Sequence, residues 1–461
     1  MVSATMLCKK ILNVKGLKVE NCTFREGTAG VQHLDLEVRP TRHAECRCPV
    51  CHRKCPKDGL SVRENREWRS LDFGAIPVHL KGSTQRIKCP VHGSVVADIP
   101  WAYPGSRFTK DFDLTVGWLA VYLPKSAVAE YMRIDWETVG RCVSRTLKDI
   151  EPDRSRRLTG LVRIGIDETS YKKGHKYITV VVNHDTNTVV WAAPGHGKKI
   201  MDRFFQGLTE TQRSSIQVVT GDGAKWITSA VEEYCPNCDR CVDPFHVVEW
   251  AMEAVDEVRR EVWREAYNEV KRLESSAARG PGRPKLDDAS SARLTAAKQK
   301  ASELKRSSYA LGKAPEHLTD NQKIQLEMIS QKNPRLYRAY RIKENLRLLL
   351  KMDDAEAAAK ELKSWLWWAS HSRIPVICNL ARKIRRHQQH ILNTIRLGLS
   401  NARIEAINNK IKLIIRKAYG FRNIDHMIDL IFLICSDLKI PLPNRKINDL
   451  QVSLPAASDR A

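Results

Sequence analysis

Short apolar runs rich in β-branched residues occupy the middle of the chain, and turn residues separate them. Three such runs lie at 161–166, 176–182 and 188–191. This pattern is typical of antiparallel strands joined by tight turns. The first run ends in Asp167, so we expect this acid on the first and central strand of a sheet.

A helical pattern and another strand follow this predicted meander. Apolar residues recur at helical spacing over 198–208, and the apolar run 216–220 then leads into Asp222. In α/β folds, ligands bind at the carboxyl ends of the strands. The Asp222 side chain is therefore predicted to face a functional site.

A third acid, Glu405, lies in a segment with helical periodicity near the C-terminus. Its apolar positions Ile404, Ile407, Ile411 and Ile414 form one buried stripe. Residues spaced three, four and seven apart share the polar face, namely Glu405, Asn408, Asn409, Lys412 and Arg416. On that face Glu405 can bind a metal while Lys412 and Arg416 contact DNA phosphates.

Three carboxylates from separate elements suit a pair of Mg²⁺ ions, because hard cations take oxygen ligands. Each acid also has a structural interpretation, as a turn former at a strand end or a solvated helical residue. Glu168 competes with Asp167, but neighbouring strand residues point to opposite faces, so only one of them faces the site. Weaker competitors are Asp185, Asp425 and Asp429.

Cysteine and histidine occur in two short knuckles, Cys48-x-x-Cys51 and Cys89-x-x-His92, with β-patterned sequence between them. The spacing predicts a zinc ribbon in which Cys48, Cys51, Cys89 and His92 hold one structural Zn²⁺ ion. Either of two further cysteines, Cys46 or Cys55, could replace a neighbour.

A second cysteine cluster has the spacing of the first knuckle but no second pair nearby. It consists of Cys235, Cys238 and Cys241. We interpret these three as incidental thiols. The odd total of 13 cysteines indicates metal ligands and free thiols in a reducing compartment rather than a disulfide framework.

Three compact helices are predicted at 113–122, 125–132 and 135–148, with a turn at 133–135 before the last. The turn followed by an Arg- and Ser-bearing helix is typical of a helix-turn-helix motif, although an ordinary helical hairpin has the same pattern. The last helix would present four side chains to a DNA major groove: Thr138, Arg141, Ser144 and Arg145.

In the long stretch between Asp222 and Glu405, the residues beyond the helix at His246 have almost entirely helical patterns and are predicted to form an insertion domain. Within it, 279–285 resembles an AT-hook whose Arg283 enters a narrow minor groove, but a basic linker fits equally well. Three tryptophans at 365, 367 and 368 cannot all face one side of a helix, so at least one is expected to be exposed.

Composition indicates a nucleic-acid partner. The 461 residues carry 77 Lys and Arg against 53 Asp and Glu, a formal net charge of +24 that favours a polyanion. No run of 18 apolar residues and no secretory signal is present, so we expect a cytoplasmic protein associated with the nucleoid.

The order of four motifs resembles the DDE transposases of bacterial insertion sequences, specifically the ISL-three group. The motifs are Gly165-Ile-Asp-Glu168, Gly221-Asp222, Asp243-Pro-Phe-His246, and Asn401-Ala-Arg-Ile-Glu405 continuing through Arg416 to Gly420-Phe-Arg-Asn423. The resemblance covers roughly residues 40 to 440.

The resemblance implies that Asp167, Asp222 and Glu405 are the catalytic triad and bind two Mg²⁺ or Mn²⁺ ions. A metal-activated water would hydrolyse a phosphodiester at the element's end, and the freed 3′-hydroxyl would then attack target DNA. Asp243 and His246 would support the active site; alternatively, Asp243 ends a fifth strand and His246 caps the next helix.

We thus expect a multidomain α/β protein with a ribonuclease-H-like catalytic core interrupted by an all-helical insertion and preceded by a zinc ribbon and a helix-turn-helix domain. The predicted boundaries are 1–100 (ribbon about 40–95), 105–155, 158–250 (core), 251–395 (insertion), 396–440 (final core helices) and a tail at 441–461.

The expected partners are double-stranded DNA, as terminal inverted repeats and target, and further copies of the chain in a homodimer or larger synaptic complex. Two other functions fit less well: a ribonuclease-H-like nuclease such as a junction resolvase, and a catalytically idle, transposase-derived DNA-binding regulator.

Overall fold

The computed structural model describes residues 3–27, 30–277, 288–398, 402–418 and 420–443. The chain forms two compact units: a first unit of Met1–Arg154 with Lys410–Ala461, and a second unit of Ser155–Asn409. Helix α16 (Ala402–Lys417) contributes residues to both units. The division into smaller domains stays a prediction.

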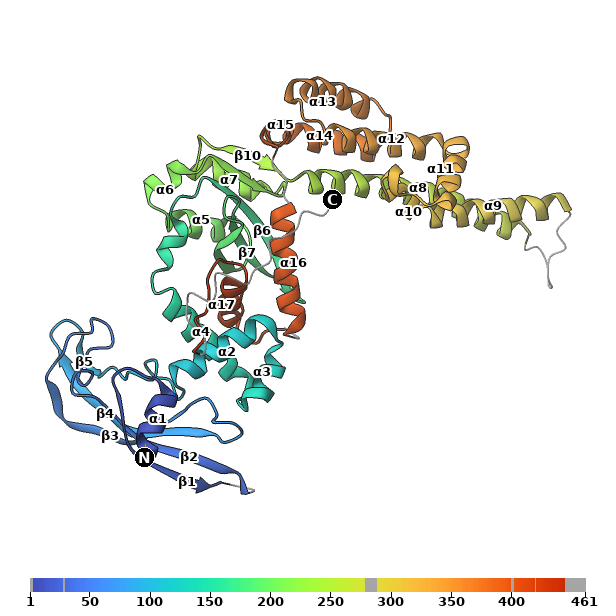
Figure 1. Ribbon diagram of the computed structural model, residues 1–461. Helices are drawn as coiled ribbons and strands as arrows, with labels where there is room; N and C mark the ends of the chain where they lie inside the picture. The colour runs from blue at the N-terminus through green and yellow to red at the C-terminus, as the bar shows by residue number, and fades with distance from the viewer. Residues whose placement is uncertain (1–2, 28–29, 278–287, 399–401, 419, 444–461) are drawn as a thin grey trace. The chain divides into compact units, whose positions relative to one another are not determined.

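The first unit begins with helix α1 (Ala4–Leu12) and a sheet built around Trp68 and Trp101. These two indoles pack edge to face, with ring centroids 5.4 Å apart, and are almost wholly buried. The sheet order is β1-β2-β4-β3, and β5 pairs with β4 (Figure 1). The strands are β1 (Leu17–Glu26), β2 (Gln32–Pro40), β3 (Lys57–Arg69), β4 (Val78–Cys89) and β5 (Gly93–Val96).

Three helices follow, as predicted: α2 (Lys110–Tyr122), α3 (Lys125–Met132) and α4 (Trp136–Ile150). The Asp135 carboxylate accepts a hydrogen bond from the Thr138 N–H and caps α4. Arg133 has a φ of 55° and forms the turn before it. Helix α17 (Ile424–Ile434) packs on α4, where the His426 ring fills the space beside Gly140.

The second unit contains a five-stranded sheet in the order β10-β9-β6-β7-β8 (Figure 1). The strands are β6 (Arg163–Lys172), β7 (Lys176–Asn183), β8 (Thr188–Pro194), β9 (Val218–Gly221) and β10 (Asp239–Val242). The first three form an antiparallel meander, and β9 and β10 add parallel to β6. The predicted meander with β6 at the centre is therefore confirmed.

Aromatic and aliphatic side chains join this sheet to its helices. Phe204 and Phe205 are almost wholly buried with Ile164 and Ile166 in one cluster. Because apolar residues alternate along β6, its Ile side chains enter this core. The helices next to the sheet strands in sequence are η2 (Arg154–Leu158), α5 (Lys198–Gln206), α6 (Glu210–Ser215) and α7 (Lys225–Tyr234).

The described residues between β10 and α16 are almost all helical, as predicted. It starts with α8 (Pro244–Ala277), a helix of 34 residues. An extended apolar cluster that includes Val258, Leu346 and Trp365 joins α8 to the later helices. These are α9 (Asp288–Arg306), α10 (Ser308–Gly312), η3 (Pro315–His317), α11 (Asp320–Lys332), α12 (Pro334–Leu349), α13 (Ala355–Ser370), α14 (Pro375–Arg386) and α15 (Gln388–Leu397).

Candidate active site and metal centre

The two cysteine knuckles come together as predicted. The ligand atoms of Cys48, Cys51, Cys89 and His92 all lie within 4.8 Å of one another. The His92 Nδ1 is 3.5 Å from the Cys48 Sγ and 3.6 Å from the Cys89 Sγ, and the Cys51 and Cys89 sulfurs are 3.7 Å apart. Zinc bonds of about 2.0–2.3 Å place tetrahedral ligands roughly 3.5–3.8 Å apart, so the donors fit Zn²⁺.

Backbone N–H groups prepare this group for a cation. Those of His92 and Val91 lower the pKa of Cys89 to about 6, which favours the thiolate that binds metal. Cys46 and Cys55 are buried beside the group but are not part of it. In the described part of the chain this is the only gathered set of His, Cys, Asp or Glu, so the Cys235 cluster forms no such set.

Asp167 lies on the central strand β6 and is half-buried. Its Oδ1 accepts a hydrogen bond from the Glu168 N–H at 2.7 Å, and its Oδ2 accepts one from the Asn408 side-chain amide. Burial raises the pKa of Asp167, and Asp222 adds to the rise; the Glu168 N–H, His246 and Asn408 oppose it.

Asp222 follows the last residue of β9, at the carboxyl end of that strand. Its Oδ1 accepts a hydrogen bond from the Ala224 N–H at 2.9 Å. Since Asp222 raises the pKa of Asp167, the two carboxylates lie in each other's electrostatic field.

Arg240 on β10 holds the main chain that carries Asp222. Its guanidinium donates to the carbonyl oxygens of Asp222 and Cys241, and more weakly to that of Gly221 at 3.5 Å. The residue is 5% exposed, and burial lowers its pKa to about 10. Among the described residues, it forms no ion pair with a carboxylate. Sequence patterns did not reveal this residue, because it reads as an ordinary strand position.

Glu405 lies in the first turn of α16 and is exposed. One turn later, Asn408 is buried and contacts Asp167, so this helix is anchored beside β6. Ile404 packs against Gly165, where a β-carbon would lie 2.0 Å from its Cδ1. The predicted apolar stripe of α16 is buried. The carboxylates of Asp167, Asp222 and Glu405 are not gathered within 4.8 Å.

The Asp243 and His246 pair lies at the start of α8. The Asp243 Oδ1 accepts a hydrogen bond from the Phe245 N–H at 2.9 Å, so the aspartate caps the helix. The His246 Nδ1 is 2.9 Å from the Glu249 Oε2. Burial disfavours the charged ring, but Glu249, Asp243, Asp222 and Asp167 together raise the pKa of His246. The two aspartates of the site therefore stabilise the protonated form of His246, whose ring is bound to Glu249.

Glu168 has its own partner. Its Oε1 accepts a hydrogen bond from the Gly197 N–H at 3.1 Å. Burial raises the pKa of Glu168, and Asp222 and Asp167 add to the rise. Glu168 thus lies in the electrostatic field of the two aspartates while its carboxylate is bound to the turn before α5.

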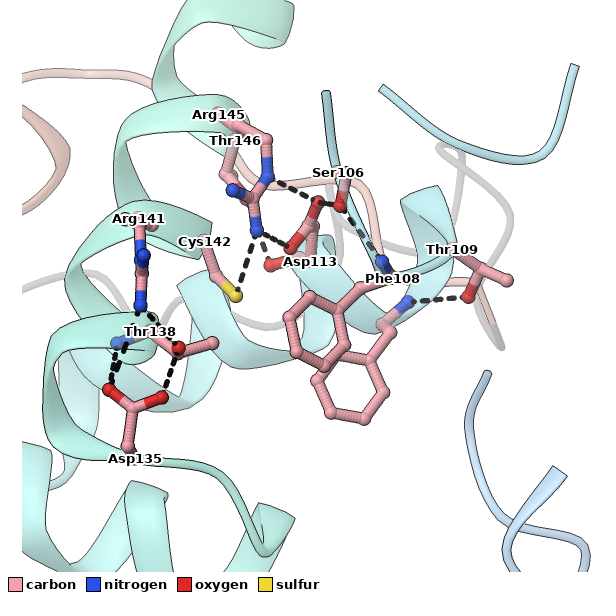
Figure 2. Close-up of polar contacts among 11 residues, drawn as sticks. Ser106, Phe108, Thr109, Asp113, Asp135, Thr138, Arg141, Cys142, Arg145 and Thr146 are labelled. Carbon is pink, nitrogen blue, oxygen red and sulfur yellow. Dashed lines mark hydrogen bonds and ion pairs between the residues drawn. The ribbon is translucent and has the colours of Figure 1, made fainter. Parts of the chain in front are cut away.

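The helix-turn-helix contains a closed network of charged and polar groups (Figure 2). Arg145 donates two hydrogen bonds of 2.7 Å to Asp113, whose side chain is fully buried. Ser106 donates to the same carboxylate at 3.1 Å. This ion pair fastens α4 to α2.

The four predicted base-contacting residues differ in their exposure and in their hydrogen-bond partners. Thr138 is buried and hydrogen-bonded to Asp135, and the Ser144 hydroxyl donates to Asp429 at 2.6 Å. Arg145 is paired with Asp113, whereas the Arg141 side chain is 55% exposed. The role of all four in DNA binding stays a prediction. Arg141 is the most exposed of them, and its guanidinium donates to the Thr138 hydroxyl at 3.0 Å and lies 3.8 Å from the Asp135 carboxylate.

Family models match both parts of this architecture. A model described as transposase matches residues 164–431, which include Asp167, Asp222 and Glu405. A model described as the helix-turn-helix domain of transposase family ISL3 matches residues 97–146, which include α2, α3 and most of α4. The chain is a DDE transposase of the ISL3 family.

Relatives of the transposase resemble it over most of its length. The transposase for insertion sequence element IS1557 of Mycobacterium tuberculosis is 41% identical over 452 residues, which cover 97% of this chain and 99% of that protein. The transposase for insertion sequence element IS1001 of Bordetella parapertussis is 26% identical over 395 residues, covering 85% of this chain and 88% of that protein.

Other predicted features of the transposase have different outcomes. Arg283 and the AT-hook-like segment lie outside the described residues. Lys412 and Arg416 are exposed on α16. Trp367 is 65% exposed while Trp365 is buried, which confirms that the three tryptophans face different sides. Within the described ranges, no helix has the length and apolarity to cross a membrane.

Proposed function

We propose that this transposase cuts and joins DNA at the acid edge, which we define as Asp167, Asp222 and Glu405. The observation that supports it most is the Asn408 contact with Asp167, because it anchors α16 beside β6 one turn from Glu405. The strand order around β6, with Asp167 in the middle of β6 and Asp222 directly after the neighbouring strand β9, supports a ribonuclease-H-like core interrupted by the helical insertion.

The three acids suit two Mg²⁺ or Mn²⁺ ions, since all offer the oxygen ligands that hard cations prefer. When bound, the ions would activate the attacking oxygen and stabilise the leaving one. Asn408 orients the Asp167 carboxylate, and Arg240 holds the main chain beneath Asp222. His246 keeps a proton at neutral pH more readily than a free histidine, because the acids and Glu249 stabilise its cation.

In this proposal the other parts select and hold DNA. The helix-turn-helix binds the terminal inverted repeats of the element, with Arg141 exposed at the surface of α4. The four-residue Cys and His group holds a structural Zn²⁺ ion. A homodimer or larger assembly brings two element ends together, and target DNA then receives the freed 3′-hydroxyl.

Cleavage and strand transfer on DNA carrying the element's own ends would test the proposal. The wild type is compared with Asp167→Ala, Asp222→Ala and Glu405→Ala, and DNA binding is measured in parallel. Asp185→Ala is the matched control, because Asp185 is a nearby acid paired with Arg163. We expect each acid-edge substitution to lower the cleavage rate by at least ~10³-fold, about 4 kcal/mol of activation free energy.

The control should cleave like the wild type, and all variants should bind DNA. Cleavage that survives one of the three substitutions would remove that acid from the metal site. Wild-type binding without cleavage in Mg²⁺ or Mn²⁺ would contradict the proposal and favour a DNA-binding regulator.

A further inference from the structure

The indole of Trp250, on α8 of the insertion, packs against the main chain that follows Asp222. A β-carbon at Gly223 would lie 2.3 and 2.4 Å from two ring atoms of Trp250 and 3.5 Å from the His387 Nε2. Only a glycine leaves room for this approach. The turn after the second aspartate is thus in direct contact with the helical insertion.

Lys383, on α14, lies over the same indole, with its Nζ 3.9 Å from the ring centroid. Burial lowers the pKa of Lys383, while Glu253, Asp222 and Glu249 oppose the decrease and Arg386 adds to it. The ammonium group is therefore within the field of Asp222 and is partly removed from water.

The Lys383 ammonium has no hydrogen bond or ion pair among the described residues. Among its charged neighbours, the Glu249 carboxylate is bound to His246 and the adjacent Arg382 donates to Asn379. Glu253 attracts the ammonium group but forms no hydrogen bond or ion pair with it. A close anion stabilises a partly desolvated cation on an indole face strongly, because water no longer fully screens the attraction between the two charges. The nearby cation Arg386 repels the Lys383 ammonium, so a bound anion would be favoured further.

We propose that Lys383, steadied by Trp250, binds a backbone phosphate of the DNA strand that enters the acid edge. The helical insertion thereby contributes directly to substrate binding beside Asp222. The partner is a phosphodiester in DNA, because a phosphate oxygen supplies the missing anion and the strand must pass Asp222 to be cut. This inference rests on the proposed function and assigns a binding role to Lys383.

Pairing of a Lys383 variant with a neutralised phosphate would test this contact directly. A duplex carrying the element's end is prepared with single methylphosphonates at successive positions around the cleavage point. Its affinity is measured in Ca²⁺ for the wild type, Lys383→Met and Arg382→Met. Met preserves the apolar stem of each side chain, and Arg382 is the neighbouring cation with a different partner.

We expect Lys383→Met to bind the unmodified duplex about tenfold more weakly than the wild type does. We expect one methylphosphonate near the cleavage point to weaken binding of the wild type by the same factor. Their combination should cost no more than either alone, because both changes remove the same contact. Lys383→Met should also lower the magnitude of the salt-dependence slope by about 0.9. Lys383→Arg should restore affinity, and Arg382→Met should show additive effects at every position.

Additive effects of Lys383→Met at every phosphate would overturn the inference, as would equal coupling for Arg382→Met. Thermal melting identifies a folding defect, since Lys383→Met should melt within a few degrees of the wild type. The binding measurement needs no catalysis. Its failure is therefore separate from that of the proposed function, which Mg²⁺-dependent cleavage by the wild type reports.

Discussion

Charged groups in the helix-turn-helix and in the Cys and His group are matched within the protein, whereas the carboxylates of the acid edge form no ion pair among the described residues. Asp167 and Asp222 accept hydrogen bonds from neutral donors only. Asp113 is matched by Arg145, and four metal ligands already surround one point. At the acid edge the carboxylates come from β6, from the residue after β9 and from α16, and Arg240 contacts only carbonyl oxygens there. Groups that stabilise the fold thus have their partners within the protein, while the carboxylates that we propose act on DNA have no cation paired with them among the described residues.

Removal of the proposed zinc ion should cause the largest loss of folding stability among the changes considered. Structural zinc in small domains contributes about 10–16 kcal/mol of binding free energy, so chelation or Cys89→Ala should unfold the region from 46 to 92. Hydrogen exchange and metal analysis would report the loss. Chelation of Mg²⁺ should leave hydrogen exchange across β6 and β9 unchanged.

Cys55→Ala is the matched control for zinc, because Cys55 is buried beside the ligands but outside their group. It should retain one zinc ion per chain. Release of zinc by this variant would show that Cys55 is a ligand and that the four-residue set is wrong.

Breaking the ion pair between Arg145 and Asp113 should cause the second-largest loss of stability. Arg145→Met leaves the Asp113 carboxylate buried without its cation, which typically costs 3–5 kcal/mol of unfolding free energy. Arg141→Met removes an exposed charge on the same helix and should change stability by about 0.5 kcal/mol or less. Urea unfolding would measure both.

The same two variants separate folding from DNA binding. Arg141→Met should lower the magnitude of the salt-dependence slope for DNA binding by about 0.9. If Arg145→Met were as stable as the wild type and lost DNA affinity in the same way, Arg145 would be a DNA contact and the network in Figure 2 would be dispensable.

Arg240→Met at the acid edge should weaken metal binding, and the associated change in free energy should be smaller than that for Arg145→Met. Loss of the guanidinium frees the carbonyl groups around Asp222, and changes in groups that orient metal ligands typically lower metal affinity by 10–100-fold. Mn²⁺ titration would measure it. Arg396→Met, which breaks an exposed pair with Asp239, is the control and should bind Mn²⁺ like the wild type.

The smallest effect should be a gain in stability for Asp167→Asn. Burial raises the folded-state pKa of Asp167, so its contribution to stability is present at low pH and is lost as the pH rises through that pKa. At pH 7.5 the neutral amide should add about 0.5–1 kcal/mol, since active sites commonly sacrifice stability. The gain should vanish near pH 3, and a gain that is independent of pH would contradict this origin.

Local patterns predicted the elements that carry most of the site. An apolar run followed by an acid correctly placed Asp167 on β6 and Asp222 after β9, because strand periodicity and strand ends are local properties. The knuckle spacing likewise predicted the gathered group of Cys48, Cys51, Cys89 and His92. Such features depend on residues close together in sequence.

Contacts between distant segments could not be predicted in this way. Asn408 and Asp167 are 241 residues apart, and nothing near either residue indicates the other. Arg145 reads as a groove-facing arginine until Asp113 on another helix is placed beside it. Arg240 reads as a strand residue because its partners are carbonyl groups, which every residue possesses.

The packing of α17 on α4 has a consequence for the order of synthesis. Asp429 receives the Ser144 hydroxyl and the Arg154 guanidinium, so the last described helix completes a region built from the first third of the chain. At about 5–20 residues per second, a ribosome needs roughly 15–55 s to travel from α4 to α17. Until then α4 lacks these contacts. A nascent or prematurely terminated chain therefore lacks the contacts that complete this region around α4.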